Sequence, residues 1–145
     1  MKLKCRRINI NEICTAERAA TGKVYKAGTC YIKLSAVDEF VGQIRSKGMI
    51  DSRFAVLEPK KEVNADYLYI AISRAFPDFL RRYRTTINLQ FDTLNYFELN
   101  WHDDKEQQEY VVKQISSIEK EINILEKQIA GEQELKKWYL SKMMV

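Results

Sequence analysis

Basic side chains that border short loops are the residues of this sequence best suited to chemistry, and the chemistry is the binding of a polyanion. Arginine presents a planar fork of donors that fits phosphates and guanine edges, and an asparagine in a following loop adds a short donor. The candidate DNA-binding residues are Lys23, Lys26, Arg45, Lys47, Arg53, Arg74, Arg81, Arg82, Tyr83, Arg84 and Asn88. The alternative for each of them is that it only keeps a helix or loop face in contact with water.

The distribution of charge favours the same function. Residues 1–100 contain 17 Lys and Arg against 11 Asp and Glu, a net of +6, whereas residues 101–145 contain 7 against 9, a net of −2. The positive field therefore belongs to the first part of the chain. A basic domain on an acidic stalk suits a nucleic acid better than a membrane surface.

Catalytic groups are sparse in the sequence. His102 is the only histidine, so a Ser/His/Asp or Cys/His site would have to use it. No glycine loop of the P-loop or dinucleotide type occurs, and the adjacent Asp103 and Asp104 are explained by helix capping. We therefore expect a binding protein without a metal or cofactor of its own; a small enzyme with an unrecognised site is the catalytic alternative.

The cysteines and the hydropathy pattern indicate a cytoplasmic protein. Cys5, Cys14 and Cys30 are an odd number of cysteines without metal-ligand spacing, which is typical of reduced cytosolic thiols. No apolar run approaches the ~18 residues of a membrane span, and no signal-peptide pattern is present. We expect no membrane partner.

Alternating apolar residues predict an α/β (α+β) globular domain over residues 1–101. Strands are expected over residues 3–10, 30–34, 40–44 and 54–57. The last strand should end before Pro59, because proline removes a donor from the ladder. A short helix capped by Asn9 or Asn11 should bury Ile13, Cys14 and Ala16. Two more helices are expected, one capped by Asn64 and one that begins at Pro77.

A long helix is predicted over residues 102–145, with Asp104 as its N-cap and Gln107 as the capping-box partner. Its apolar residues recur in steps of four and three, which is a heptad pattern that needs a partner helix. The predicted dimerisation residues are Val111, Ile115, Ile118, Ile122, Leu125 and Ile129. Gly131 interrupts this pattern. The alternative is an amphipathic helix packed on its own domain.

Several short sequence segments occur in an order that resembles the order seen in a known protein family. They are Tyr31-Ile32-Lys33-Leu34-Ser35, Phe54-Ala55-Val56-Leu57-Glu58-Pro59-Lys60, Asn64-Ala65-Asp66-Tyr67-Leu68-Tyr69, Ile87-Asn88-Leu89-Gln90 followed by Leu94, and Glu106-Gln107 at the start of the long helix. The ordered set resembles one target-recognition domain plus the conserved coiled-coil helix of the specificity subunit of type I restriction–modification systems. It covers nearly the whole chain.

The resemblance implies a non-catalytic protein. In that family each recognition domain reads a half-site of double-stranded DNA, and the long helices act as a spacer and a docking surface for the methylation subunits. Those subunits use S-adenosylmethionine, and added restriction subunits cleave unmodified DNA. This sequence departs from the family pattern in lacking prolines before Glu106-Gln107, and in having one recognition domain and one helix where a full subunit has two of each.

We therefore expect a DNA-recognition half-subunit that forms an antiparallel homodimer or pairs with another half-subunit. Its partners would be DNA and the methylation and restriction subunits. The alternative is a coiled-coil dimerisation protein without sequence-specific DNA binding.

Overall fold

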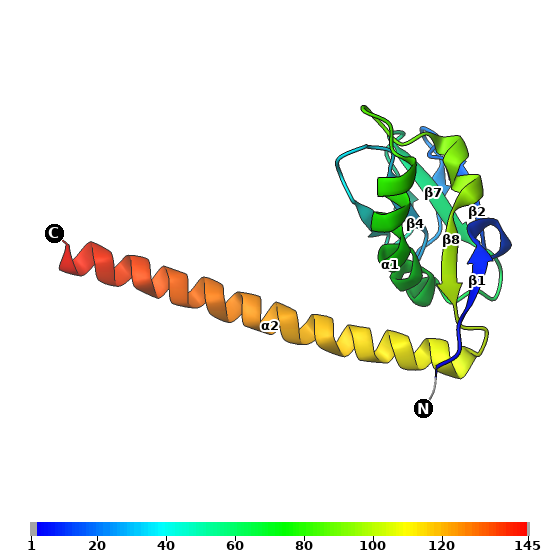
Figure 1. The fold of residues 1–145 in the computed structure, drawn as a ribbon. Helices are drawn as coiled ribbons and strands as arrows, with labels where there is room; N and C mark the ends of the chain where they lie inside the picture. Colours follow the sequence, from blue (N-terminus) through cyan, green and yellow to red (C-terminus); the bar gives the residue numbers. More distant parts are fainter. Residues whose placement is uncertain (1–2, 145) are drawn as a thin grey trace. The chain divides into compact units, whose positions relative to one another are not determined.

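The structure is a computed structural model that describes residues 3–144 (Figure 1). The chain divides between Glu109 and Tyr110 into two compact units. The first is a mixed sheet and helix unit, and the second is formed by the remainder of one long C-terminal helix, as the fold class predicted from the sequence requires.

A four-stranded antiparallel sheet is the centre of the globular unit. Its strand order is β2-β7-β4-β5. The strands are β2 (Cys14–Arg18), β7 (Phe54–Pro59), β4 (Cys30–Lys33) and β5 (Val41–Gln43). Tyr31 lies opposite both Val56 and Gly42. A Cβ atom on Gly42 would come within 2.4 Å of the Tyr31 ring, so glycine lets this ring lie across the strand.

Helix α1 (Ala65–Tyr83) is amphipathic and buries one stripe against the sheet side of the unit. Its N-cap is Asn64, whose side chain accepts hydrogen bonds from the backbone N–H groups of Asp66 and Tyr67, as the sequence predicts. The buried stripe contains Tyr67, Leu68, Ala71, Ile72, Phe76, Phe79 and Leu80. Near the C-terminal end of this stripe, the Phe79 ring stacks on the Phe97 ring, and the ring centroids are 4.4 Å apart. Phe97 is the residue immediately before strand β8 (Glu98–Trp101).

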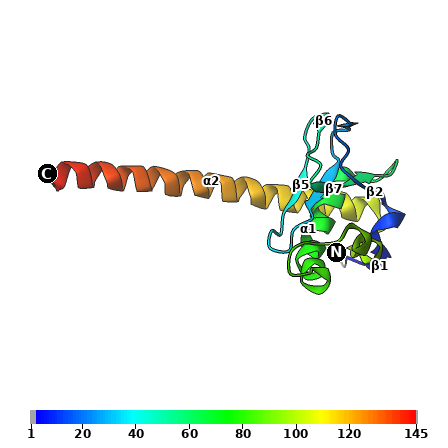
Figure 2. The same cartoon turned by 90° about the horizontal axis from the view of Figure 1, so that it is seen from above.

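Two short two-stranded sheets complete the globular unit. One pairs β1 (Arg6–Asn9) with β8 (Glu98–Trp101) and buries Ile8 against Leu99. The other pairs β3 (Val24–Tyr25) with β6 (Gly48–Met49). Tyr25 packs with Ala19, Ile50 and Val56 in its own small apolar cluster. Figure 2 shows β6 and α1 on opposite sides of the central sheet.

The remaining elements join these sheets to the C-terminal helix. A 3₁₀ helix, η1 (Ile10–Glu12), is capped by Asn9, and a second, η2 (Phe91–Tyr96), precedes β8. Helix α2 runs over Lys105–Met143, or about 58 Å at ~1.5 Å per residue. It continues through Gly131, where glycine costs a helix interior only about 1 kcal/mol.

Several local predictions were wrong. The chain forms one helix through Pro77 instead of two, because a single buried stripe continues on both sides of the proline and outweighs the missing N–H donor. Residues from Cys14 onward form a strand rather than a helix. Strand β7 includes Pro59, which pairs only with β2 at the end of the sheet.

The starts of β1 and α2 also differ from the prediction. Leu3 and Cys5 precede β1 and are exposed, so the first strand is shorter than expected. Asp104 does accept a hydrogen bond from the Glu106 N–H at 2.9 Å. The side-chain oxygen of Gln107, however, accepts from the Lys4 backbone N–H instead of completing a capping box.

Candidate nucleic-acid interface

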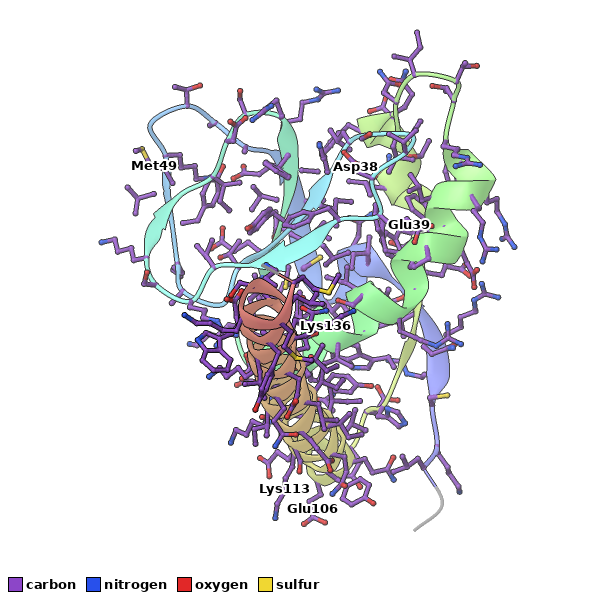
Figure 3. The ribbon with its side chains drawn as sticks, turned by 90° about the vertical axis from the view of Figure 1, so that its left-hand side faces the viewer. Asp38, Glu39, Met49, Glu106, Lys113 and Lys136 are labelled. Atoms are coloured by element: carbon purple, nitrogen blue, oxygen red, sulfur yellow. The ribbon has the colours of Figure 1, made fainter. Side chains whose placement is uncertain are left out.

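The predicted DNA-binding residues lie in two groups on the globular unit. The ribbon group is Lys23, Lys26, Arg45, Lys47 and Arg53. The helix group is Arg74, Arg81, Arg82, Tyr83, Arg84 and Asn88. Figure 3 shows Met49 of the β3–β6 ribbon and helix α1 on either side of the loop that carries Asp38 and Glu39. That these residues contact DNA stays a prediction.

Pairing of β3 with β6 brings Lys26 and Lys47 of the ribbon group together from two distant segments. Tyr25 lies opposite Gly48, so Lys26 and Lys47, the next residues along each strand, lie at the same end of the ribbon. All five side chains of the group are exposed. Sequence patterning missed this pairing because each strand has only two residues, which is too short for alternation to be recognised.

Two members of the ribbon group are already ion-paired with a carboxylate of this chain. The Lys23 ammonium lies 2.6 Å from Glu17, and this hydrogen bond raises the pKa of Lys23 and lowers that of Glu17. Arg53 donates to both carboxylate oxygens of Asp51, whose pKa it lowers. Both pairs are exposed to water, which screens their attraction, so a phosphate can compete for either cation.

The helix group is built on the last turns of α1 and the loop that follows. Arg74, Arg81 and Arg82 are exposed on α1, and Arg81 is paired with Asp78 one turn earlier. The half-buried Tyr83 ring stacks on Tyr96, with planes 10° apart and centroids 6.0 Å apart. This stacking orients the Tyr83 ring beside the arginines at the end of α1, and its predicted contact with DNA stays a prediction.

The loop after α1 is held by its own hydrogen bonds. The backbone oxygen of Asn88 accepts from the Thr85 N–H and from the Thr85 hydroxyl, both at 2.8 Å. Arg84 donates to the backbone oxygen of Ala36 at 3.2 Å, which ties the end of α1 to the loop before β5. Within this loop the Ile87 side chain is 84 % exposed.

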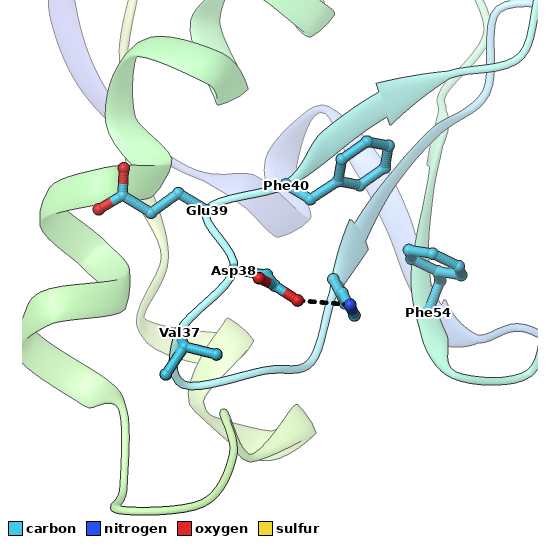
Figure 4. A pocket seen from close by; sticks show the side chains of 6 residues that line it. Val37, Asp38, Glu39, Phe40 and Phe54 are labelled. Carbon is cyan, nitrogen blue, oxygen red and sulfur yellow. Dashed lines mark hydrogen bonds and ion pairs between the residues drawn. The ribbon is translucent and has the colours of Figure 1, made fainter.

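An open hollow of about 620 Å³ lies beside the loop that carries Asp38 and Glu39 (Figure 4). It is lined by Lys33, Val37, Asp38, Glu39, Phe40 and Phe54. Lys33 is paired with Asp38 across it. With two carboxylates and one lysine, this surface repels phosphates, so the positive surface consists of the two groups and not of the hollow.

The groups that could support catalysis have structural roles. The His102 Nδ1 atom lies 2.5 Å from the Tyr67 hydroxyl in a half-buried position. Burial raises the pKa of Cys14 and of Cys30 to about 12, which keeps both as thiols at neutral pH. Among residues 3–144, no three His, Cys, Asp or Glu side chains gather closely enough to hold a metal ion.

Helix α2 carries a second candidate surface, an apolar seam along an otherwise charged helix. Within the seam, the side chains of Ile118, Ile122, Leu125 and Ile129 are 47–58 % exposed. Beyond Gly131 the helix also exposes Leu135, Trp138, Tyr139, Leu140 and Met143, and Met144 just after the helix is exposed as well. Neither α-helix in the described part of the chain combines the length and apolarity that crossing a bilayer requires.

Sequence comparison finds no relative: no model of a known protein family and no curated protein matches this chain. Comparison of structures does find similar folds. The S subunit of a type I restriction–modification system from M. genitalium superposes with a TM-score of 0.64 at 13 % identity, over 85 % of this chain and 41 % of that one. The HsdS subunit from Thermoanaerobacter tengcongensis superposes with a TM-score of 0.59 at 14 % identity, over 85 % and 39 %.

A third structure, described as the basis of complex assembly and conformational transition of the type I R-M system, superposes with a TM-score of 0.72 at 17 % identity. That match covers 92 % of this chain and 43 % of the other. The chain is therefore a mixed α/β unit with a long helix, and it spans about two fifths of the length of the three chains. The fold is that of type I restriction–modification S subunits, which confirms the resemblance found in the sequence at the level of the fold.

Proposed function

We propose that this chain is a DNA-binding specificity component of a type I restriction–modification system. The observation that carries the proposal is the structural match, which extends over 85–92 % of the chain. Two groups of exposed basic side chains on the globular unit support it, because phosphate contacts supply most of the affinity of proteins for DNA.

The second part of the proposal concerns assembly. The apolar seam of α2 pairs with the seam of a second copy, or of a similar half-subunit, in antiparallel orientation. The support is the exposure of Ile118, Ile122, Leu125 and Ile129, since large apolar side chains in a row on a charged helix are stable when a partner helix covers them. The pair would hold two recognition units at its ends and would direct methylation and restriction subunits to a bipartite target.

Binding of duplex DNA at several salt concentrations tests the first part. For a protein that neutralises several phosphates, the logarithm of the binding constant falls linearly with the logarithm of the salt concentration. The slope is about −0.9 for each phosphate neutralised. A steep slope together with preference for one sequence supports the proposal. Binding that is absent, or that has no salt dependence, contradicts it.

One alternative function has an observation in its favour. Lys23, Arg53 and Arg81 are already paired with carboxylates, which is the arrangement expected of residues that only keep a surface hydrated. On this alternative the chain is a coiled-coil interaction protein without sequence-specific DNA binding. It would form the α2 pair and still fail the DNA-binding test.

A further inference from the structure

The β3–β6 ribbon exposes two apolar side chains that lie directly opposite each other. Val24 is the cross-strand partner of Met49, and the two are 51 % and 69 % exposed. Opposite residues of an antiparallel pair have Cβ atoms ~4.5–5.5 Å apart. Val24 and Met49 therefore form one continuous apolar ridge on the outer side of the ribbon.

Packing within the chain does not explain this ridge. The inward side of the ribbon carries Tyr25, which is 1 % exposed and whose hydroxyl accepts the Ala20 N–H at 3.1 Å. Ile50, at the end of β6, is buried in the same cluster. These residues attach the ribbon to the sheet, whereas a threonine in place of Val24 would satisfy the same backbone ladder. Two adjacent exposed apolar side chains that the fold does not require are a candidate surface for contact with another molecule.

The charges around the ridge define the chemistry of that molecule. Residues 20–29 and 44–53 contain five Lys and Arg and one Asp, and five minus one gives a net of +4. Lys26 and Lys47 lie at one end of the ridge, and Arg45 precedes them in the loop from β5. Lys23 directly precedes Val24 at the other end, so cationic side chains lie at both ends of the ridge. A partner with dense negative charge on both sides of a narrow apolar feature complements this arrangement. Duplex DNA has that form, with phosphates on both sides of a groove.

Resting on the DNA binding proposed above, we propose that the β3–β6 ribbon enters the major groove and that Val24 and Met49 contact the C5 methyl groups of thymines. The major groove is ~12 Å wide and admits a two-stranded ribbon, and the thymine methyl is the apolar group that its floor presents. Lys26, Arg45 and Lys47 hold the phosphates at one edge of the groove, and Lys23 lies towards the other edge. The ridge is then a determinant of base preference, and the lysines are determinants of affinity.

Replacement of thymine by deoxyuridine tests the proposal at the level of one methyl group. A duplex selected from random sequences with the full chain is resynthesised with each thymine in turn changed to deoxyuridine. Burial of a methyl-sized group contributes ~0.8 kcal/mol, so at one or two positions the affinity should fall about fourfold. In a Val24→Ala/Met49→Ala variant, the thymine and deoxyuridine duplexes should bind equally.

Ile87→Ala is the matched control, because Ile87 is also exposed and lies beside the arginines of the helix group. This variant should keep the fourfold difference. A difference that is absent at every position, or that persists in the Val24/Met49 variant, overturns the proposal while leaving DNA binding in place. If DNA affinities stay unchanged and the Val24/Met49 variant instead fails to bind a methylation subunit, the ridge is a protein interface and the proposal is also overturned.

Different results would contradict the proposed DNA-binding function and the proposed role of the ridge. A parent chain that binds no duplex overturns both proposals. Because Val24 and Met49 are exposed, the double variant should unfold at the same temperature as the parent, which separates a defect in recognition from a defect in folding.

Discussion

The Tyr67 hydroxyl accepts the backbone N–H of His102 at 3.0 Å and lies 2.5 Å from the Nδ1 atom of the same residue. This single phenol therefore connects the first turns of α1 to the residue that follows β8. The His102 backbone oxygen in turn accepts a hydrogen bond from the buried side chain of Gln108 at 2.6 Å. The three residues form a polar network that fixes the first turn of α2 within the globular unit.

Tyr67→Phe should lower the free energy of unfolding by about 1–3 kcal/mol, because it leaves the half-buried His102 N–H without its acceptor. The measurement is urea unfolding of the full chain. Tyr69→Phe, on the same helix and only half-buried, is the control and should change stability by less than about 0.5 kcal/mol. Equal stability of the Tyr67 variant and the parent would show that the network contributes nothing.

The buried thiols give a pH dependence with a definite sign. Burial raises the pKa of both Cys14 and Cys30 from 9.0 to about 12, so the folded state holds protons that the unfolded state releases. Their effect on stability is complete below pH 9 and is lost as the pH rises towards 12. Urea midpoints of the parent should fall across this range more steeply than those of a Cys14→Ala/Cys30→Ala variant. Parallel profiles would contradict the assignment.

Sequence reasoning worked where a local signal and the tertiary fold agree. Asn64 caps α1 as expected, and the pattern of strands 30–34 and 40–44 was confirmed by β4 and β5. The prediction that a new helix begins at Pro77 was wrong. The local effect of proline favours a break in the helix, but α1 continues past Pro77 because its buried stripe packs against the folded sheet, and this packing is not visible in the local sequence.

The candidate interface could be predicted in its residues but not in its arrangement. Lys26 and Lys47 are 21 positions apart, and they meet because Tyr25 buries its ring and sets the register of a two-residue strand. Val24 and Met49 carry no signal of their own in the sequence, since a single exposed valine or methionine is normal for a soluble fold. Their significance depends on their being opposite each other.

Replacing Arg81, Arg82 and Arg84 with alanine should weaken DNA binding strongly. All three side chains are exposed, so the fold should be kept, and the structural cost is the loss of the Arg84 hydrogen bond to the Ala36 backbone oxygen. Removing one bidentate interaction with a base costs ~1–3 kcal/mol, and each phosphate that is no longer neutralised reduces the salt slope by about 0.9. Lys120→Ala/Lys127→Ala/Lys136→Ala on α2 removes the same charge and should bind like the parent. If the two triple variants bind alike, the DNA-binding surface lies elsewhere.

Ile122→Lys should convert a dimer to a monomer, because a lysine at the centre of the α2 seam would place an unpaired charge among apolar side chains. Sedimentation velocity measures the change. Ile124→Lys is the matched control: Ile124 is 57 % exposed, comparable to Ile122 at 47 %, but it lies off the seam and should leave the dimer unchanged. A parent that stays monomeric at high concentration argues against the pairing.

The dimer should be antiparallel and two-fold symmetric, and its DNA site should be a gapped palindrome. Closed two-fold symmetry is the commonest arrangement of homo-oligomers, and two identical readers related by such an axis must bind the same half-site in inverted order. The spacer would follow from the length of α2, about 58 Å for 39 residues at ~1.5 Å each. Selection of sites from random duplexes, with a methylation subunit present, measures this directly. Enrichment of one half-site, or of two unlike halves, would exclude the symmetric homodimer and indicate pairing with a different half-subunit.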